Sequence, residues 1–423
     1  MNVSDTEIVT SILQENGYKM SAQIDEADIL IFNTCSVRQH AEDRVLGRIN
    51  NEMTRKTENP LLKIGVIGCM AQRLGTRLRE KNRAIDFVVG TDQYRKLPEI
   101  IAQLYHNSCF RENIQINDKE VYEGFYPCHQ GRFTAFVTIM RGCNNFCSYC
   151  IVPYTRGRER SRRPQEILSE IRKLGRSGYK DITLLGQNVN SYYHDNVDFP
   201  SLLKMIDKID SIYRIRFITS HPKDLSDSLI STMASCGKVC EHIHLGMQSG
   251  DDEILRRMNR GYSGDQFLQL TRKLRKAIPD IAITTDVIAG FPGESEEQFQ
   301  RTLDLMREVE FDYAFTFKFS PRSGTRAAEL DGQLPEEICL ARLQRLINLQ
   351  EDITLKKYQY QIGKTKEIFV EHFSKKSERE VSGKSRDFKI TVFPGSSDLL
   401  GKLVKVKITA ASGWTLKGSA ILG

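Results

Sequence analysis

The sequence has no apolar run long enough to cross a membrane, and no charged-then-apolar segment at its start of the kind that directs export. It also has no internal repeat and no low-complexity tract. We therefore expect a cytoplasmic protein with no membrane partner. Its 423 residues are enough for roughly three domains of ordinary size, each with its own core.

Disulfides are not expected either, although the chain has ten cysteines. The cytoplasm keeps thiols reduced, so cysteines there are more often metal ligands or buried thiols. The formal net charge of +7 is compatible with a polyanionic partner but does not by itself indicate one. The spacing of the cysteines must therefore decide what they do.

Short apolar runs alternate with helical stretches in the first part of the chain. A helix with a capping box at Ser4 and Glu7 comes first, and apolar runs follow at residues 28–35, 63–69 and 86–90. This alternation predicts an α/β domain with a doubly wound parallel sheet over residues 1–106. Cys35 and Cys69 follow two of these strands, at the edge where such sheets bind ligands, although two unrelated buried cysteines are the alternative.

A doubly wound domain normally begins with a strand that feeds its first helix, and no such strand precedes this helix. We therefore expect that the chain has been trimmed at its start. Residues 107–130 have little periodicity and are predicted to be a linker.

From residue 131 the alternation of strands and helices resumes. Six strands are predicted at residues 133–140, 181–186, 214–220, 242–247, 282–289 and 313–319, separated by amphipathic helices such as 164–177, 201–209 and 295–309. This pattern predicts a partial (β/α)6 barrel over residues 131–358, open on one side and followed by a long helix at 336–358. After residue 360, short strands are predicted at residues 367–371, 388–392, 403–409 and 416–422, with Gly and Ser turns between them. They predict a small all-β barrel over residues 360–423, of a kind that binds nucleic acid.

Three cysteines follow the first predicted barrel strand with C-x3-C-x2-C spacing, namely Cys143, Cys147 and Cys150. Three thiolates on one loop can hold three irons of a cubane and leave the fourth iron open for S-adenosylmethionine (SAM). A structural zinc site would need a fourth Cys or His nearby, and the next ones are distant in sequence. The spacing therefore favours a 4Fe–4S cluster over zinc.

The triplet, with Tyr149 just before its last cysteine, resembles the signature of the radical SAM superfamily. The resemblance implies that Cys143, Cys147 and Cys150 are catalytic and that they hold the cluster that cleaves SAM to a carbon radical. It also implies SAM contacts at the ends of the barrel strands. The candidates for cofactor binding are Tyr149, Arg158, Gly186, Gln187, Gln248, Ser249 and Asp286. Any one of the glycine-containing segments could equally be an ordinary turn.

Residues 150–163, together with Met1-Asn2, Asn33-Thr34-Cys35 and Ile67-Gly68-Cys69, are similar to the methylthiotransferase family over essentially the whole chain. The resemblance implies an N-terminal methylthiotransferase domain, a radical SAM barrel and a C-terminal TRAM domain. It also implies a second 4Fe–4S cluster on three cysteines, two of which match Cys35 and Cys69. The third lies in a Gly-Cys-x-Met-Asn motif, two positions before the residue matching Met1, and this sequence lacks it.

Within the family, the first motif and the 153–160 run are similar to the MiaB branch. That branch adds a methylthio group to carbon 2 of N6-isopentenyladenosine at position 37 of tRNA. The implied partners are the tRNA anticodon stem-loop, an electron donor such as flavodoxin or ferredoxin, and a donor of sulfur or iron–sulfur clusters. The alternatives are sister enzymes acting on threonylcarbamoyladenosine or on a ribosomal protein aspartate, and a non-catalytic iron–sulfur RNA-binding protein.

Two basic segments are candidates for RNA contact. The first is the arginine run Arg156, Arg158, Arg160, Arg162 and Arg163, which could bind phosphates or the SAM carboxylate, or could be an ion-paired turn around Glu159. The second segment, in the C-terminal module, contains Lys402, Lys405, Lys407 and Lys417. Phe388, Phe393 and Trp414 could stack on bases there, or could equally form the core of the small barrel. A core position is favoured for Phe388, and the choice is left open for Trp414.

The remaining cysteines and two histidines have ordinary explanations. Cys236 and Cys240 form a C-x3-C pair with no third ligand close by and are expected to be buried or incidental thiols, as are Cys109, Cys128 and Cys339. His221 and His244 lie near strand ends and either line the cavity or are hydrogen-bonded core residues.

Overall fold

A computed structural model describes residues 1–36, 39–107, 109–129 and 131–421. The chain divides into two compact units. Unit 1 comprises residues 1–130, 138–166 and 322–325, and unit 2 comprises residues 131–137, 167–321 and 326–423. The cysteine triplet therefore belongs to the same unit as the N-terminal domain.

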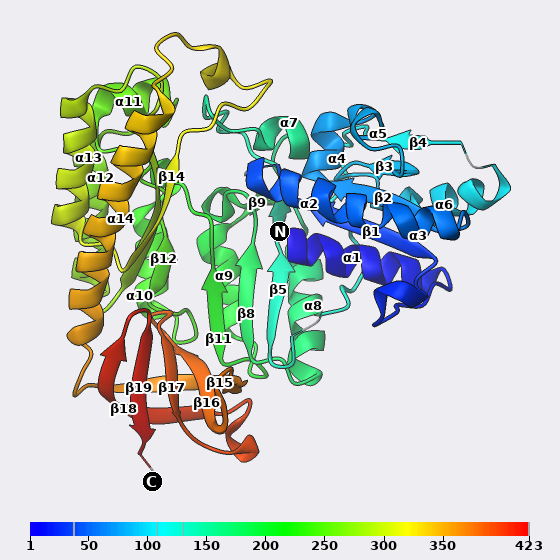
Figure 1. Ribbon diagram of the computed structural model, residues 1–423. Coiled ribbons are helices and arrows are strands. Elements are labelled where there is room, and N and C mark those ends of the chain that lie inside the picture. Colours follow the sequence, from blue (N-terminus) through cyan, green and yellow to red (C-terminus); the bar gives the residue numbers. More distant parts are fainter. Residues whose placement is uncertain (37–38, 108, 130, 422–423) are drawn as a thin grey trace. The chain divides into compact units, whose positions relative to one another are not determined.

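Unit 1 is built on a parallel sheet of four strands in the order β1-β2-β3-β4 (Figure 1). The strands are β1 (Ile29–Thr34), β2 (Lys63–Gly68), β3 (Phe87–Val89) and β4 (Arg111–Asn113). The helices are α1 (Asn2–Glu15), α2 (Gln39–Asn51), α3 (Met53–Glu58), α4 (Cys69–Leu74), α5 (Arg77–Lys81) and α6 (Leu97–His106). The first three strands and their parallel pairing confirm the predicted doubly wound class.

Apolar side chains pack on both faces of this sheet. Phe87 and Val89 of β3 join one cluster with α1 and α6, whereas Val88 between them joins another cluster with α4 and α5. Successive side chains of a strand point to opposite faces, so a strand between two helical layers must be apolar throughout. This arrangement explains why β2 and β3 read as continuous apolar runs.

The predicted capping box at the start of α1 is wrong. The helix begins at Asn2, and no side chain caps it. The Ser4 hydroxyl instead lies 2.8 Å from that of Thr138, and a Glu7 carboxylate oxygen lies 3.1 Å from Nδ1 of His129. Both side chains therefore make tertiary contacts that the local pattern could not reveal.

Residues 107–130, predicted to be a linker, contain a strand and a buried tyrosine. Strand β4 pairs in parallel with β3, and Tyr122 is buried in the same cluster as α1 and α6. The strand was missed because its Arg-Glu-Asn sequence is polar, as an edge strand can be. Residues 108 and 130 of the predicted linker, and residue 422 of the last predicted strand, lie outside the described residues.

Unit 2 contains the six parallel strands that the sequence predicted. They are β5 (Thr134–Thr138), β8 (Asp181–Leu185), β11 (Arg214–Phe217), β12 (His242–His244), β13 (Ala282–Ala289) and β14 (Tyr313–Lys318). They form two three-stranded sheets, β11-β8-β5 and β12-β13-β14, and parallel bridges at Ile215↔Val239 and Ser220↔Leu245 continue the pairing between them. The strands follow one another in chain order, as in a partial barrel.

Helices follow the strands of this partial barrel (Figure 1). They are α8 (Pro164–Arg176), α9 (Phe199–Asp207), α10 (Asp227–Ser235), α11 (Asp252–Arg257), α12 (Gly264–Ala277), α13 (Glu296–Val309) and α14 (Glu336–Gln359). Ser263 and Ser295 form complete capping boxes at the starts of α12 and α13. In these helices the sequence signal for a helix start is correct.

The C-terminal module is a closed barrel with strand order β15-β16-β17-β19-β18. Its strands are β15 (Thr365–Ser374), β16 (Ser377–Ser385), β17 (Ile390–Pro394), β18 (Leu403–Ser412) and β19 (Thr415–Ala420). The sequence did not predict β16, because its only buried large apolar residue is Val381. The all-β class is nevertheless confirmed.

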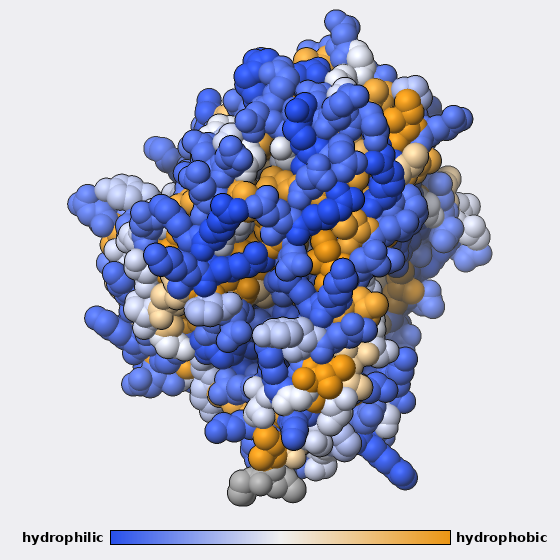
Figure 2. All heavy atoms as spheres, turned by 90° about the vertical axis from the view of Figure 1, so that its left-hand side faces the viewer, coloured by the Kyte–Doolittle hydropathy of each residue, from blue (hydrophilic) through white to orange (hydrophobic). Residues whose placement is uncertain are grey.

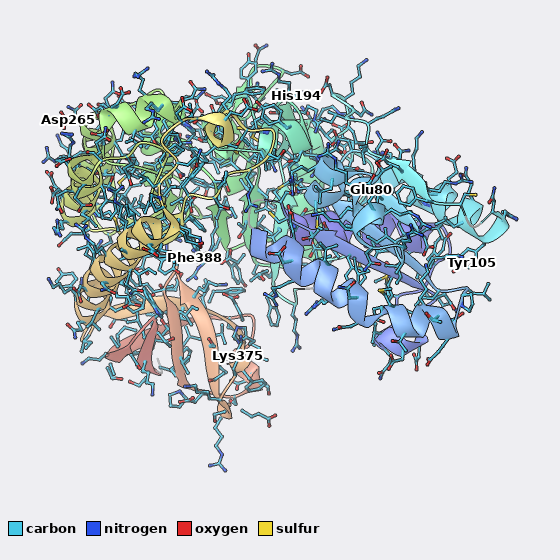
Figure 3. The ribbon with its side chains drawn as sticks, turned by 45° about the horizontal axis from the view of Figure 1, so that its top comes forward. Glu80, Tyr105, His194, Asp265, Lys375 and Phe388 are labelled. Carbon is cyan, nitrogen blue, oxygen red and sulfur yellow. The ribbon has the colours of Figure 1, made fainter. Side chains whose placement is uncertain are left out.

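Buried arginines join this small barrel to the parallel strands of unit 2. Arg214 donates to the backbone oxygen of Lys384 at 2.6 Å, and Arg216 donates to that of Ser385 at 2.9 Å. Phe388, labelled in Figure 3 where the two parts meet, stacks on the His242 ring with centroids 4.7 Å apart. The C-terminal barrel is therefore packed against the strands and is not a loosely tethered module.

Figure 2 looks onto the side of the molecule that lies on the left of Figure 1, and most of this surface is hydrophilic, with separate apolar patches. In the part of the chain that the structure describes, no helix combines the length and the apolarity that a membrane span requires.

Candidate functional site

The cysteine triplet lies on a loop closed by a short antiparallel pair, β6 (Met140–Arg141) with β7 (Arg160–Ser161). The Cys143 N–H donates to the backbone oxygen of Gly157 at 3.1 Å. Gly142 has φ +78°, and a Cβ at this position would lie 1.9 Å from the backbone oxygen of Arg158. Only glycine fits this close approach, so the two arms of the loop come together directly before the first cysteine.

The three thiols lie close to the protein interior. Cys143 and Cys147 are each 8% exposed, Cys150 is half-buried, and the Cys150 N–H donates to the Cys147 oxygen at 2.9 Å. Among the described residues, no three His, Cys, Asp or Glu side chains converge as ligands of a single ion would. A cubane attaches each thiolate to a different iron, and three thiols on one short loop are the donors that such a cluster requires.

The arginine run after the triplet does not form an exposed phosphate clamp. Arg156 donates to one oxygen of Asp5 at 2.6 Å, and Arg141, from the other arm of the loop, donates to the second oxygen at 2.9 Å. Burial alone would raise the pKa of Asp5, but the two guanidinium charges outweigh it and lower the pKa to about 2. A single carboxylate of helix α1 therefore holds both arms of the cysteine loop.

Two more members of the run are buried in the same way. Arg160 makes two bonds to Asp92, of 2.9 and 3.1 Å, and Arg162 donates to the backbone oxygen of Thr138 at 2.7 Å. Phosphate contact is expected of at least one member of the run, and Arg156, Arg160 and Arg162 are poor candidates because they donate to buried acids and backbone oxygens. The alternative of an ion-paired turn is confirmed for Arg156 and Arg160, whose partners are Asp5 and Asp92 and not the predicted Glu159.

Arg158 and Arg163 are the exposed members of the run. Arg158 lies over the Phe146 ring at 4.3 Å, and Arg163 pairs with Glu123 at 2.8 Å. Glu159 accepts from the Asn144 N–H, and its own N–H donates to the Asn144 side chain, each at 3.2 Å. Arg158 is therefore the member of the run that stays a candidate for cofactor binding.

Cys35 and Cys69 follow two neighbouring strands of the parallel sheet. Thr34 at the end of β1 is in register with Gly68 at the end of β2, so the two cysteines come next at the same edge. Gly68 has φ +90°, and a Cβ there would lie 2.5 Å from the Asn33 side-chain oxygen. Cys69 is buried and is the first residue of α4.

The motifs that carried the family resemblance meet at this edge. The Asn33 side chain donates to the backbone oxygen of Asn2 and to the Thr6 hydroxyl, each at 2.9 Å. Helix α4, which Cys69 begins, packs against α7 (Val152–Arg156), which directly follows the triplet. Unit 1 therefore contains both sets of cysteines, and the helix that Cys69 begins contacts the helix that follows the triplet.

An ion pair between the buried Glu42 and Arg73 holds the segment that follows Cys35. The Ser36 hydroxyl donates to Glu42 at 2.6 Å, and Arg73 of α4 reaches the other Glu42 oxygen, also at 2.6 Å. Glu42 is 2% exposed, so its charge depends on this partner. The segment after β1 is thereby tied to the helix that Cys69 begins.

The predicted SAM segments lie in unit 2 at or near the carboxyl ends of its strands. Gly186 and Gln187 come directly after β8, and Gln187 Oε1 is buried without a hydrogen-bond partner. Asn188 next to them donates to Asp224 at 2.7 Å. An unpartnered buried carbonyl oxygen is unfavourable, so Gln187 fits a role as an acceptor for a ligand.

Gln248 and Ser249 follow β12. Gln248 has φ +67°, and its backbone N–H donates to the backbone oxygen of Asp286 at 2.8 Å. The Ser249 hydroxyl accepts from the Asp251 N–H at 3.2 Å, so it already has a structural partner. Asp286 lies within β13 rather than at its end, and His244 Nε2 lies 3.1 Å from its carboxylate.

The glycine turn after β13 is held by Glu294. Its carboxylate accepts from the Gly290 N–H at 2.8 Å and from Arg342 at 2.9 Å. Burial raises the pKa of Glu294 to about 7 despite these partners. Sequence reasoning did not single out Glu294, Asp5 or Asp92, and no local pattern around them shows which distant arginine each would meet.

In the C-terminal module, Phe393 is buried in the barrel core, which is one of the two alternatives for this residue. The core position predicted for Phe388 is wrong: this residue is 39% exposed and packs on His242. Trp414 is exposed and contacts Tyr313. The four predicted lysines, Lys402, Lys405, Lys407 and Lys417, are all exposed.

The other cysteines and histidines follow the ordinary explanations. Cys236, Cys240 and Cys339 are buried, and Cys109 and Cys128 are exposed. His221 is buried, and its Nδ1 accepts from the Lys223 N–H at 3.3 Å. Burial and the Arg260 charge lower the pKa of His221 to about 2, so the ring is neutral at ordinary pH.

Three family models match successive parts of the chain. The model for uncharacterized protein family UPF0004 matches residues 1–90, that for the radical SAM superfamily matches residues 137–306, and that for the TRAM domain matches residues 359–421. Among solved structures, a radical S-adenosylmethionine methyltransferase, TsrM, from Kitasatospora setae has a TM-score of 0.57 at 15% identity, over 74% of this chain and 69% of that one. The cobalamin-dependent radical enzyme OxsB has a TM-score of 0.55 at 15% identity, over 82% of this chain and 53% of that one. These structures support the radical SAM fold.

Curated relatives match the whole chain. A protein from Thermoanaerobacter sp. (strain X514), named tRNA-2-methylthio-N(6)-dimethylallyladenosine synthase, is 46% identical over 100% of this chain and 90% of its own length. A protein of the same name from Carboxydothermus hydrogenoformans is 47% identical over 99% of this chain and 96% of its own length. With identity of this extent over its full length, the chain belongs to the family of tRNA-2-methylthio-N(6)-dimethylallyladenosine synthases, which are radical SAM methylthiotransferases.

Proposed function

We propose that this protein attaches a methylthio group to carbon 2 of N6-isopentenyladenosine at position 37 of tRNA. The observation that carries the proposal is that unit 1 contains two sets of cysteines, the triplet before α7 and the pair Cys35 and Cys69 at the sheet edge, and that α4, which Cys69 begins, contacts α7. A methylthiotransferase needs both a source of radicals and a source of sulfur. The family of full-length relatives supports the same substrate.

The chemistry fits a radical mechanism because carbon 2 of adenine is an unactivated C–H position. When bound, two 4Fe–4S clusters and SAM supply a carbon radical and the sulfur to be transferred. We propose that Cys143, Cys147 and Cys150 hold one cluster and leave one iron open. Cys35 and Cys69 are proposed as ligands of the second cluster.

Seven residues are proposed to contact SAM. They are Tyr149, Arg158, Gly186, Gln187, Gln248, Ser249 and Asp286. Gln187, with its unpartnered buried oxygen, is proposed to accept from the amino group of SAM. Arg158, the exposed arginine beside the loop, is suited to the carboxylate of SAM.

The domain limits proposed are residues 1–106 for the methylthiotransferase domain, 107–130 for the connection, 131–358 for the radical SAM domain and 360–423 for the TRAM domain. The proposed partners are the tRNA anticodon stem-loop, an electron donor such as flavodoxin or ferredoxin, and a donor of sulfur or clusters. We propose a cytoplasmic location, where tRNA and such donors are found.

Nucleoside mass spectrometry of tRNA tests the proposed reaction. We expect tRNA from cells that lack this gene to contain N6-isopentenyladenosine in place of its methylthio form, and the gene to restore the methylthio form. A Cys240→Ala gene should restore it as well, whereas a Cys147→Ala gene should not. Retention of the methylthio nucleoside without the gene, or loss only of a methylthiolated threonylcarbamoyl nucleoside, would contradict the substrate assignment.

A further inference from the structure

We propose that a line of aromatic side chains in unit 2, Trp414, Tyr313 and Phe315 with His244 at its end, is a stacking surface for unpaired bases of the substrate RNA. The inference rests on the proposed function only for the identity of the RNA as tRNA. It adds a surface on which the nucleotides beside the modified one bind, and it names base stacking as the contact.

The four rings form a continuous series of edge-to-face contacts. Trp414 and Tyr313 have ring centroids 5.1 Å apart, and Tyr313 and Phe315 have centroids 4.7 Å apart. Phe315 and His244 follow at 5.9 Å. Trp414 lies in the turn between β18 and β19, so the line runs from the C-terminal barrel along β14 to β12.

These residues lie on the face of the β12-β13-β14 sheet that the helices leave open. His244 is in register with Thr284 and Thr284 with Tyr313, while Asp286 is in register with Phe315. Residues in register point to the same side of a sheet, and their chain neighbours point to the other. Those neighbours in β13, Thr285 and Val287, are fully buried, and α14 packs on β13 and β14.

The open face exposes two large aromatic side chains. Phe315 is 42% exposed and Trp414 is 43% exposed, although both lie beside other aromatic rings. Contiguous exposed aromatic surface in a folded protein commonly marks a binding site. Every base offers a flat π-face to such rings, so stacking there needs no particular sequence.

Exposed lysines of the C-terminal barrel lie on the two strands that Trp414 connects. Lys405 and Lys407 occupy outward positions of β18, Lys417 is exposed on β19, and Trp414 lies in the turn that joins these two strands. Lysines beside exposed aromatic rings form the usual combination for single-stranded nucleic acid, because the lysines neutralise phosphates while the rings receive bases.

Polar groups on the same face favour RNA over a protein partner. His244 and Asp286 are hydrogen-bonded to each other and lie beside Phe315, and the Asp286 side chain is 34% exposed. An apolar protein surface docked on Phe315 would bury this carboxylate without adding a partner, which is costly. A base has polar edges as well as a flat face, so it can stack without that cost.

Trp414 is the single tryptophan of the chain, so its fluorescence reports directly on this surface. We expect an unmodified anticodon stem-loop RNA to quench Trp414 emission, and a fully paired duplex of the same stem to quench it much less. Phe315→Leu should weaken binding of the stem-loop by about 5- to 100-fold, the loss that one base stack represents, whereas Phe315→Tyr should retain it. Tyr360→Leu, which removes another exposed aromatic ring of unit 2, is the matched control and should bind normally.

Equal quenching by stem-loop and duplex would overturn the proposal, as would unchanged binding by Phe315→Leu. Trp414→Leu, followed by the anisotropy of labelled RNA, should show a similar loss and covers the case in which Phe315→Leu does not fold. If tRNA nucleosides depend on the gene but the RNA does not quench Trp414, the stacking surface fails alone; quenching without that dependence would overturn only the proposed function.

Discussion

Two regions of this protein are rich in positive charge, and their environments are opposite. In unit 1, three arginines of the 156–163 run are buried and bonded to acids or carbonyls, including Arg156 to Asp5 and Arg160 to Asp92. In the C-terminal barrel, Lys405, Lys407 and Lys417 alternate with inward residues and are exposed. The arginines therefore hold the cysteine loop in place, whereas the lysines are available to a polyanion.

The difference shows that a basic run in a sequence has no fixed meaning. A guanidinium can be buried where a carboxylate accepts its hydrogen bonds. Asp5 accepts from Arg141 with one oxygen and from Arg156 with the other. A lysine on alternate positions of a barrel strand points outward whatever lies nearby. Mutations in the arginine region should therefore lower the stability of the protein, whereas mutations in the lysine region should weaken RNA binding.

The largest expected effect is that of Asp5→Asn. This substitution leaves two buried guanidinium groups without their carboxylate, so the free energy of unfolding of unit 1 should fall by about 3–5 kcal/mol. Urea unfolding followed by circular dichroism measures it, because the only tryptophan lies in unit 2. Asp25→Asn, an exposed acid of the same unit, is the control and should change little. A loss below 1 kcal/mol would show that the buried pairs are not what holds the loop.

Acid should remove the same contribution more gradually. The pKa of Asp5 is lowered to about 2 in the folded protein from an ordinary value of 3.8, so its stabilisation is present at neutral pH and is lost as the pH falls from about 4 to about 2. We expect the stability gap between the native protein and Asp5→Asn to narrow by about 2 kcal/mol over that range. Other groups titrate equally in both proteins and cancel in the difference. A gap independent of pH would contradict the charge pairing.

The lysine region should show the opposite response. Replacing Lys405, Lys407 and Lys417 together by Gln should weaken stem-loop RNA binding by about tenfold or more and reduce the salt dependence of binding by roughly 0.7–0.9 per lost phosphate contact. Thermal stability should stay the same. The control is Lys375→Gln with Lys376→Gln, in another exposed turn of the barrel (Figure 3). An unchanged salt slope would mean that phosphates do not contact this stripe.

The smallest effect is expected at the exposed end of the arginine run. Arg163 is 53% exposed and pairs with Glu123, which is 28% exposed, so Arg163→Gln should cost less than about 1 kcal/mol of stability. Urea unfolding of this variant and of Asp5→Asn, which removes the partner of the buried Arg156, compares an exposed member of the run with a buried one. If both substitutions lowered the free energy of unfolding equally, burial would not explain the difference between the Arg156 and Arg163 ion pairs.

The sequence predicted the elements that depend on local periodicity. All six barrel strands and the first three strands of unit 1 were found because their apolar patterns are complete within a few residues. Strands β4 and β16 were missed because their sequences are polar or Gly- and Ser-containing, and their place is set by the neighbour with which they pair. The same local view placed Phe388 in a core, whereas its ring stacks on His242, far away in the chain.

The site divides in the same way. The spacing of Cys143, Cys147 and Cys150 is local and could be interpreted chemically from the sequence. Asp5 lies 136 residues before Arg141 and 151 before Arg156, so no window of sequence contains both partners. The register of Thr34 with Gly68, which places Cys35 and Cys69 together, follows from strand pairing, and the sequence indicated it only through the rule for parallel sheets.

The most direct test of the cluster site is the formation of 5′-deoxyadenosine by anaerobically reconstituted, reduced protein given SAM. We predict that the native protein forms 5′-deoxyadenosine and that Cys147→Ala forms none, while Cys240→Ala, which removes another buried thiol, forms it at the native rate. Iron and sulfide analysis of the same samples shows which variants hold a cluster. Formation of 5′-deoxyadenosine by Cys147→Ala, or none by the native protein with its cluster present, would contradict the assignment of radical chemistry to this loop.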